Sequence, residues 1–219
     1  ISFPEGLTVR EVFDKLAADP NLSGDLPEEL PLEGSLMPQT FSFARGTPRT
    51  EIVEQMREGQ AALVDEIWLQ RAGDLPIENK EEFLTLASIV EKETGVPDER
   101  PLVAAVFLNR LKSGMRLQSD PTVIYGIFGG EGKPSDRPIY RSDLDKETPY
   151  NTYRINGLPP GPIANPGRDA LEAVANPAET DALYFVADGS GGHAFAETLD
   201  EHNANVRAWR KVEAERSAN

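Results

Sequence analysis

The stretch "LASIVEKET", Leu86 to Thr94, decides how the middle of this 219-residue chain folds. Its apolar residues recur at spacings of three and four, which is the pattern of a helix with one buried face. The stretch belongs to a predicted helix from about Asn79 to Thr94, and two glutamates, Glu91 and Glu93, stand near its end. At about 100° per residue the two glutamates point to opposite flanks of the buried face. They are therefore not a pair.

Neighbour size is the guide to which glutamate has room for a ligand. A helical side chain leans toward the residues three and four positions before it. Glu91 therefore lies over the small Ser88 and Ala87, whereas Glu93 lies over two bulky residues. Space and partly apolar surroundings would raise the pKa of Glu91 and suit a general acid. The alternative, which the pattern alone favours, is that both glutamates are boundary residues whose carboxylates reach water.

The whole chain predicts an α+β fold, with a mostly helical catalytic domain and a small mixed or antiparallel sheet. Helical periodicity and capping signals predict helices at 8–18, 48–72, 79–94, 98–113, 120–126, 168–177 and 199–217. Two β-rich runs, "ALYFVAD" and "HAFAET", flank the turn "GSGG" and predict a returning pair of strands. A proline-rich stretch follows the first helix. We therefore expect residues 1–33 to form a small subdomain with its linker, and residues 34–219 the main domain.

Composition limits the function classes. The formal net charge of −15 disfavours a nucleic-acid partner. There is no cysteine, and the two histidines, His193 and His202, do not have the helical spacing of a zinc site. We expect no metal and no cofactor. No apolar run approaches the length of a membrane span, but the chain begins "ISFPEG" without Met, so we expect a longer protein whose first part is missing here.

Several blocks of the sequence occur in an order that resembles a known family. They are "FPEG" (3–6), "LEGSLMPQTF" (32–41), "LASIVEKET" (86–94), "VAAVFLNRLKSGMRLQSDPTVIYG" (103–126), "YNTYRINGLPPGPIANPG" (150–167) and "LYFVADGSGGHAFAETLDEHN" (183–203). Together they are similar to the YceG-like family, the endolytic murein (lytic) transglycosylases also called MltG. The piece "SLMPQ" departs from the family pattern, which more often has an aromatic residue before the proline and an acid after it.

The resemblance implies a bacterial enzyme of cell-wall biogenesis. Family members are held in the cytoplasmic (inner) membrane by a single N-terminal helix, absent from this chain, with the catalytic body on the periplasmic or extracytoplasmic side. They carry a LysM-like subdomain, of which residues 1–18 would be the remnant. They cut nascent peptidoglycan strands internally at the MurNAc–GlcNAc β-1,4 bond, leave a 1,6-anhydroMurNAc end, and work beside peptidoglycan synthases, the penicillin-binding proteins. The family's catalytic glutamate corresponds to Glu91.

Further polar residues are candidates for holding the glycan, and each has a structural alternative. Asp120 in "LQSDP" could simply cap a helix, and the residues of "YNTY" could form a packed loop with buried hydrogen bonds. Asn109 could be a polar contact within the core, and His193 a hydrogen-bonding residue at a strand end. The substrate-binding candidates are Asn109, Gln118, Asp120, Tyr150, Asn151 and Tyr153.

Two other functions stay open at this stage. A muramidase would cut the same bond with water as the acceptor and would use a second carboxylate, for which Asp120 is available if the fold brings it near. A scaffold would bind peptidoglycan without turnover, which a LysM-like remnant alone could support.

Overall fold

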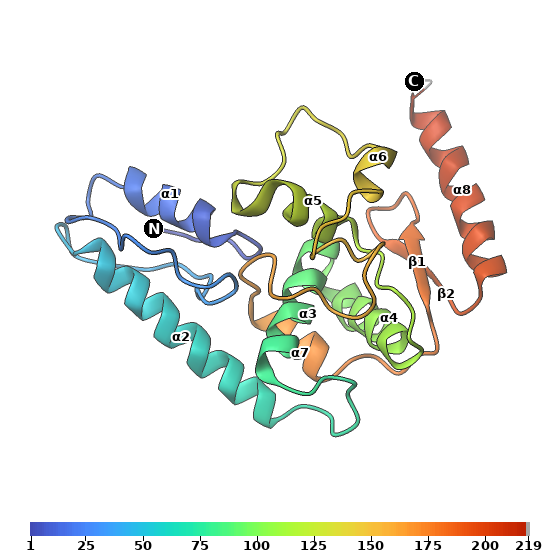
Figure 1. The fold of residues 1–219 in the computed structure, drawn as a ribbon, viewed down its shortest axis with the longest axis horizontal. Coiled ribbons are helices and arrows are strands. Elements are labelled where there is room, and N and C mark those ends of the chain that lie inside the picture. The colour runs from blue at the N-terminus through green and yellow to red at the C-terminus, as the bar shows by residue number, and fades with distance from the viewer. Residues whose placement is uncertain (218–219) are drawn as a thin grey trace.

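The computed structural model, which describes residues 1–217, is mainly helical with one small sheet (Figure 1). The predicted α+β class is confirmed. The helices are α1 (Val9–Ala18), α2 (Arg49–Leu69), α3 (Lys80–Glu93), α4 (Arg100–Lys112), α5 (Asp120–Phe128), α6 (Arg141–Leu144), α7 (Arg168–Ala175) and α8 (Leu199–Ser217), with 3-10 turns η1 (Pro97–Glu99) and η2 (Gly129–Glu131). Within residues 1–217, no helix combines the length and the apolar character needed to cross a membrane.

The sheet is a single antiparallel hairpin. Strand β1 (Tyr184–Ala187) pairs with β2 (His193–Ala196), as the two β-rich runs predict, and α8 packs against it on the side away from α3 (Figure 1). Near the start of the chain, Ser2 and Thr40 form an isolated antiparallel bridge.

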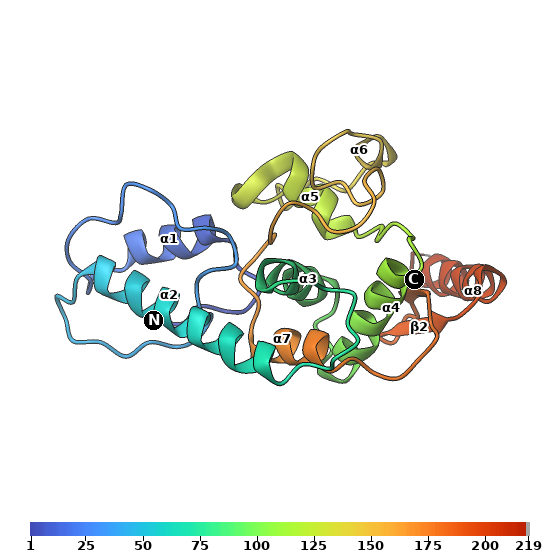
Figure 2. The ribbon, with the colours of Figure 1, turned by 60° about the horizontal axis from the view of Figure 1, so that its bottom comes forward.

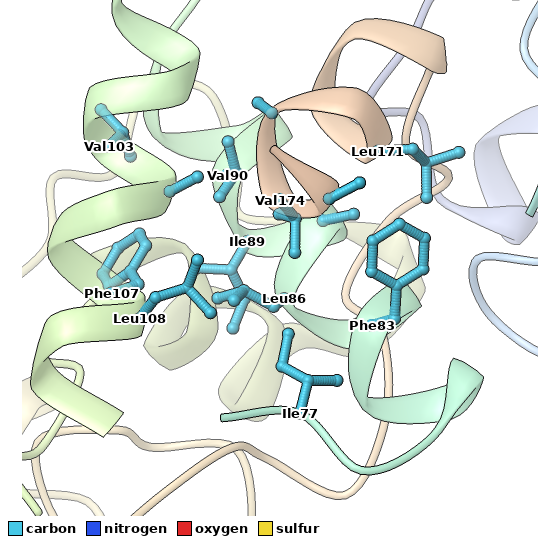
Figure 3. Close-up of a cluster of buried hydrophobic side chains, with 14 of the residues drawn as sticks. Ile77, Phe83, Leu86, Ile89, Val90, Val103, Phe107, Leu108, Leu171 and Val174 are labelled. Carbon is cyan, nitrogen blue, oxygen red and sulfur yellow. The ribbon is translucent and has the colours of Figure 1, made fainter. Parts of the chain in front are cut away.

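The central core is built around α3. Phe83, Leu86 and Ile89 on this helix are fully buried, and they face side chains from α4 and α7 (Figure 3). Burying a side chain of this size contributes roughly 1.5–3 kcal/mol, so this interface fixes how α3 is oriented. Helix α7 lies between α2 and α4 and covers one side of α3 (Figure 2).

A second apolar cluster lies at the N-terminal end of the molecule, where α1 and the first half of α2 run side by side (Figures 1 and 2). It joins residues on both sides of the expected boundary near residue 33. Its members include Phe3, Val12, Phe13, Leu16, Leu36, Phe41, Ile52 and Met56. The division into residues 1–33 and 34–219 stays a prediction, and so does the LysM-like character of the first part.

Both ends of α3 have identifiable partners. At its start the side chain of Asn79 accepts a hydrogen bond from the Glu82 amide at 2.9 Å, which is an N-cap. Near its end the Lys92 ammonium donates to the carbonyl of Gly6 at 3.0 Å. The last turn of α3 is therefore tied to the N-terminal segment, and its position does not depend on apolar packing alone.

Candidate active site

The side chain of Glu93, in the last turn of α3, is held by one neighbour from a distant segment. The Ser119 hydroxyl donates a hydrogen bond to Glu93 Oε1 at 2.5 Å. Ser119 is buried, with 1% of its surface exposed, while Glu93 is only partly covered. The carboxyl group is therefore fixed at Oε1, while Glu93 as a whole residue keeps an intermediate exposure.

The backbone before α5 is fixed by several contacts that turn Ser119 toward Glu93. The Ser119 amide donates to the Thr152 hydroxyl at 2.9 Å, and the Thr122 hydroxyl donates to the Ser119 carbonyl at 2.7 Å. The guanidinium of Arg110 donates to the Leu117 carbonyl at 2.7 Å. Because these contacts come from α4, α5 and the loop around residue 152, the position of Ser119 is set by the tertiary structure.

Gln118 shows that this turn is strained. Its φ angle is +54°, the left-handed region that a residue other than glycine, asparagine or aspartate seldom adopts. The amide of Gln118 donates to the Thr152 carbonyl at 3.2 Å, which supports the unusual conformation, and its side chain is exposed. Strain of this kind costs about 1–3 kcal/mol and tends to occur where function requires a particular geometry.

Glu93 has a strongly shifted acidity. Burial raises its pKa to about 7, because the charged form loses solvation. The negative charge of Asp120 acts in the same direction, whereas the Ser119 hydrogen bond and the charges of His193 and Arg110 act against it. A carboxyl group with a pKa near 7 can give up and take back a proton at neutral pH, as a general acid–base requires.

Asp120 is the second carboxylate at this site. It is exposed, and its Oδ1 accepts a hydrogen bond from the Tyr153 hydroxyl at 2.7 Å. The expected capping role of Asp120 is wrong: the N-cap of α5 is Ser119, and Asp120 is the first residue of the helix. Its charge raises the pKa of Glu93, and Tyr153 interacts electrostatically with both carboxylates.

Glu91 has a different environment, on the opposite flank of α3. Its Oε2 accepts a hydrogen bond from the Gly167 amide at 3.0 Å, and its Oε1 lies 3.5 Å from the Arg100 guanidinium. Arg100 also lies 3.2 Å from Asp169 and 3.8 Å from Glu5. Burial raises the pKa of Glu91, and the Gly167 hydrogen bond opposes this. The cluster joins α3, α4, α7 and the N-terminal segment.

The open space expected beside Glu91 is absent, and that prediction is wrong. The small side chain of Ser88 is fully buried and accepts a hydrogen bond from the Ile163 amide at 3.0 Å. The loop that continues to Gly167 fills the volume above the helix, and only 5% of the Glu91 side chain is exposed. Small neighbours made room for another part of the chain, which sequence spacing could not reveal.

The remaining predicted residues divide between structural and peripheral positions. The Asn109 amide donates to the carbonyls of Thr180 and Ala182, so it positions the segment before β1. Asn151 is fully buried and donates to two carbonyls in its own loop. Tyr150 lines a different cavity, of about 520 Å³, which lies between α2, α3 and the loop at residues 160–162. Of the six candidates, Asp120 and Tyr153 interact electrostatically with Glu93, and Gln118 is the residue before Ser119 in the chain.

His193 begins β2, as the strand-end interpretation expects. Its backbone amide and its Nδ1 are 2.7 and 2.8 Å from the two carboxylate oxygens of Glu99. The imidazole is thus oriented by Glu99 and contributes to the field at Glu93.

Sequence reasoning missed Arg100, Arg110 and the role of Ser119. Each is largely buried, but their partners lie tens of residues away in the chain. The sequence contains one indication of this role: Ser119 stands immediately before a predicted helix start. A serine at that position is usually interpreted as a helix N-cap.

Comparison with known proteins agrees with the resemblance. The YceG-like family matches residues 1–208. A protein of Bacillus subtilis (strain 168), named endolytic murein transglycosylase, is 41% identical over 79% of this chain and 46% of its own length. A protein of the same name from Streptococcus pneumoniae serotype 2 is 35% identical over 80% of this chain and 32% of its own length.

A solved structure agrees at the level of the fold. The crystal structure of a yceG-like protein from Listeria monocytogenes has a TM-score of 0.72 and 33% identity, and covers 93% of this chain and 74% of that one. The chain belongs to the YceG-like family. It spans less than half the length of the two curated relatives described above.

Proposed function

We propose that this chain carries the catalytic domain of an endolytic peptidoglycan lytic transglycosylase, with Glu93 as its general acid–base. The family and the names of its relatives support the activity. The observation that carries the proposal is a single carboxyl group with a pKa of about 7, held at Oε1 by Ser119 and influenced by the charge of the exposed Asp120. The substrate is the glycan of nascent peptidoglycan strands.

The reaction needs one group that first gives and then takes a proton. Protonated Glu93 donates to the oxygen of the MurNAc–GlcNAc β-1,4 bond, and the bond from C1 of the muramoyl residue to that oxygen breaks. The resulting carboxylate then removes the proton from the muramoyl 6-hydroxyl, whose oxygen forms a bond to C1. The product has a 1,6-anhydroMurNAc end, Glu93 is protonated again, and no water is consumed.

The geometry favours Glu93 over Glu91, the residue that the family resemblance indicated. Both carboxyl groups have a raised pKa, but Glu91 accepts a hydrogen bond from a buried backbone amide and lies against the Arg100 guanidinium. That environment suits a permanent carboxylate joining four segments. The assignment of catalysis to Glu91 stays a prediction, and the two glutamates can be separated by experiment.

The test compares Glu93→Gln with Glu91→Gln on purified peptidoglycan, with products analysed by mass spectrometry. Glu93→Gln should abolish the formation of anhydro ends while the circular dichroism spectrum is unchanged. Glu91→Gln should retain turnover. The reverse result would return the catalytic role to Glu91, and equal turnover by wild type and both variants would leave neither glutamate as the acid.

The second candidate function is a muramidase, which Asp120 favours because it places another carboxylate beside Glu93. The product decides between them, since a reducing end is heavier than an anhydro end by one water. A non-catalytic scaffold would bind strands and release no product. Association with penicillin-binding proteins, and anchoring in the inner membrane with the body outside the cytoplasm, belong to this proposal as properties of the whole protein.

A further inference from the structure

The two oxygens of the Glu93 carboxyl group are not equivalent. Oε1 accepts a hydrogen bond from the Ser119 hydroxyl at 2.5 Å. Within residues 1–217, the Glu93 side chain makes no other hydrogen bond. Oε2 has no such partner there. A carboxyl group held at one oxygen has a defined plane and a defined second oxygen, which is the arrangement that directed proton transfer needs.

The cost of building this contact indicates that it does more than fill the interior. A buried hydroxyl can donate its hydrogen bond to a nearby backbone carbonyl, as the Thr122 hydroxyl does. Ser119 instead points at a carboxyl group on another helix, and the preceding residue, Gln118, adopts a left-handed conformation. The backbone of Ser119 is bound on its amide side by Thr152 and on its carbonyl side by Thr122, so the hydroxyl has little freedom to turn away.

We propose that Ser119 is a positioning residue for Glu93: its hydroxyl holds Oε1, so that Oε2 is the oxygen that exchanges the proton with the glycan. Ser119 donates to the carboxylate, and that donation stabilises the state in which Glu93 has just protonated the leaving oxygen. It does not itself touch the substrate. The inference rests on the proposed function, and the Ser119–Glu93 contact itself can be tested in the absence of glycan.

Other charges also act on Glu93, so a test must separate them from Ser119. Asp120 raises its pKa from the start of α5, while Arg110 on α4 and His193 on β2 lower it. Tyr153 lies in the same field through its hydrogen bond with Asp120. All four of these side chains remain in a Ser119→Ala variant, which removes only the hydroxyl.

The experiment follows the Glu93 carboxyl carbon by NMR in protein with labelled glutamate, its signal identified by its loss in Glu93→Gln. Ser119→Ala should move the titration midpoint upward by about one to two pH units, the loss expected for a hydrogen bond to a charged group. Ser119→Thr keeps a hydroxyl and should stay near wild type. Thr85→Val is the matched control: it deletes another buried hydroxyl on α3, one that donates to the Glu81 carbonyl rather than to Ser119 or Glu93, and should leave the midpoint in place.

Turnover gives the second readout. In Ser119→Ala we expect kcat to fall about 10- to 100-fold with little change in KM, and the alkaline limb of the pH–rate profile to move upward with the NMR midpoint. An unchanged midpoint in Ser119→Ala, or an equal shift in Thr85→Val, overturns the inference even if wild type cleaves glycan. A shifted midpoint with no cleavage by wild type would instead remove the proposed function and leave the Ser119–Glu93 contact standing.

Discussion

Replacing Glu93 with glutamine should make the folded protein more stable at neutral and alkaline pH while it removes the proposed acid. Burial raises the pKa of Glu93 from its usual 4.5 to about 7. Between these values the folded state keeps a proton that the unfolded chain has released. The stability of the wild type therefore falls as pH rises through this interval. Glutamine has a similar shape and no charge to lose, so the variant escapes this loss.

The size of the effect follows from the interval. Each pH unit between the two pKa values changes the free energy of unfolding by about 1.4 kcal/mol. Over the whole interval of about 2.5 pH units the variant should gain roughly 3–4 kcal/mol relative to wild type. Below pH 4.5 the gain is absent, because residue 93 is neutral in wild type as well as in Glu93→Gln. Above pH 7 the gain is complete.

The assay is denaturant unfolding of wild type and Glu93→Gln at a series of pH values on both sides of the interval. The difference in unfolding free energy should rise with pH and then level off. Glu91→Gln is a comparison on the same helix: burial raises the pKa of Glu91 less strongly, so its stability difference from wild type should rise less with pH than that of Glu93→Gln. Parallel pH profiles for wild type and Glu93→Gln would mean that the folded protein does not perturb Glu93, and the case for it as the acid would fail.

Two further predictions concern the Arg100 cluster. Arg100→Met should cost about 3–5 kcal/mol in denaturant unfolding, because it leaves the buried Glu91 and the nearby Asp169 without their cation; a loss below the error of the measurement would show that the cluster is solvated. Gly167→Ala should destabilise, since an added Cβ would clash with the side chain of Glu5. Combining it with Glu5→Ala should recover most of the loss, and purely additive effects would contradict this steric explanation.

The sequence predicted the helices well because their signals are local. Apolar spacing, a capping asparagine at residue 79 and a proline in the first turn of α4 are all readable within one turn of chain. The hairpin of β1 and β2 was equally local, with a glycine-rich turn between two β-rich runs. The family resemblance then indicated the activity, which the spacing of apolar residues cannot predict.

The choice between the two glutamates of "LASIVEKET" could not be made in the same way. Angle placed Glu91 and Glu93 on opposite flanks of α3, and this is confirmed by their separate partners. The partner on each flank is distant in sequence: Gly167 is 76 residues from Glu91, and Ser119 is 26 residues from Glu93. The small neighbours of Glu91 therefore indicated close packing of the chain, where an open groove was expected.

Local sequence patterns specify every helix except the short α6, together with the hairpin, and the sequence also identifies the family and the two candidate carboxylates. Only the tertiary structure decided which carboxylate is clamped by a guanidinium and a backbone amide, and which is held by one hydroxyl. The physical reason is that acidity depends on desolvation and on neighbouring charges, and both are contributed by segments that are distant in sequence and adjacent only after folding.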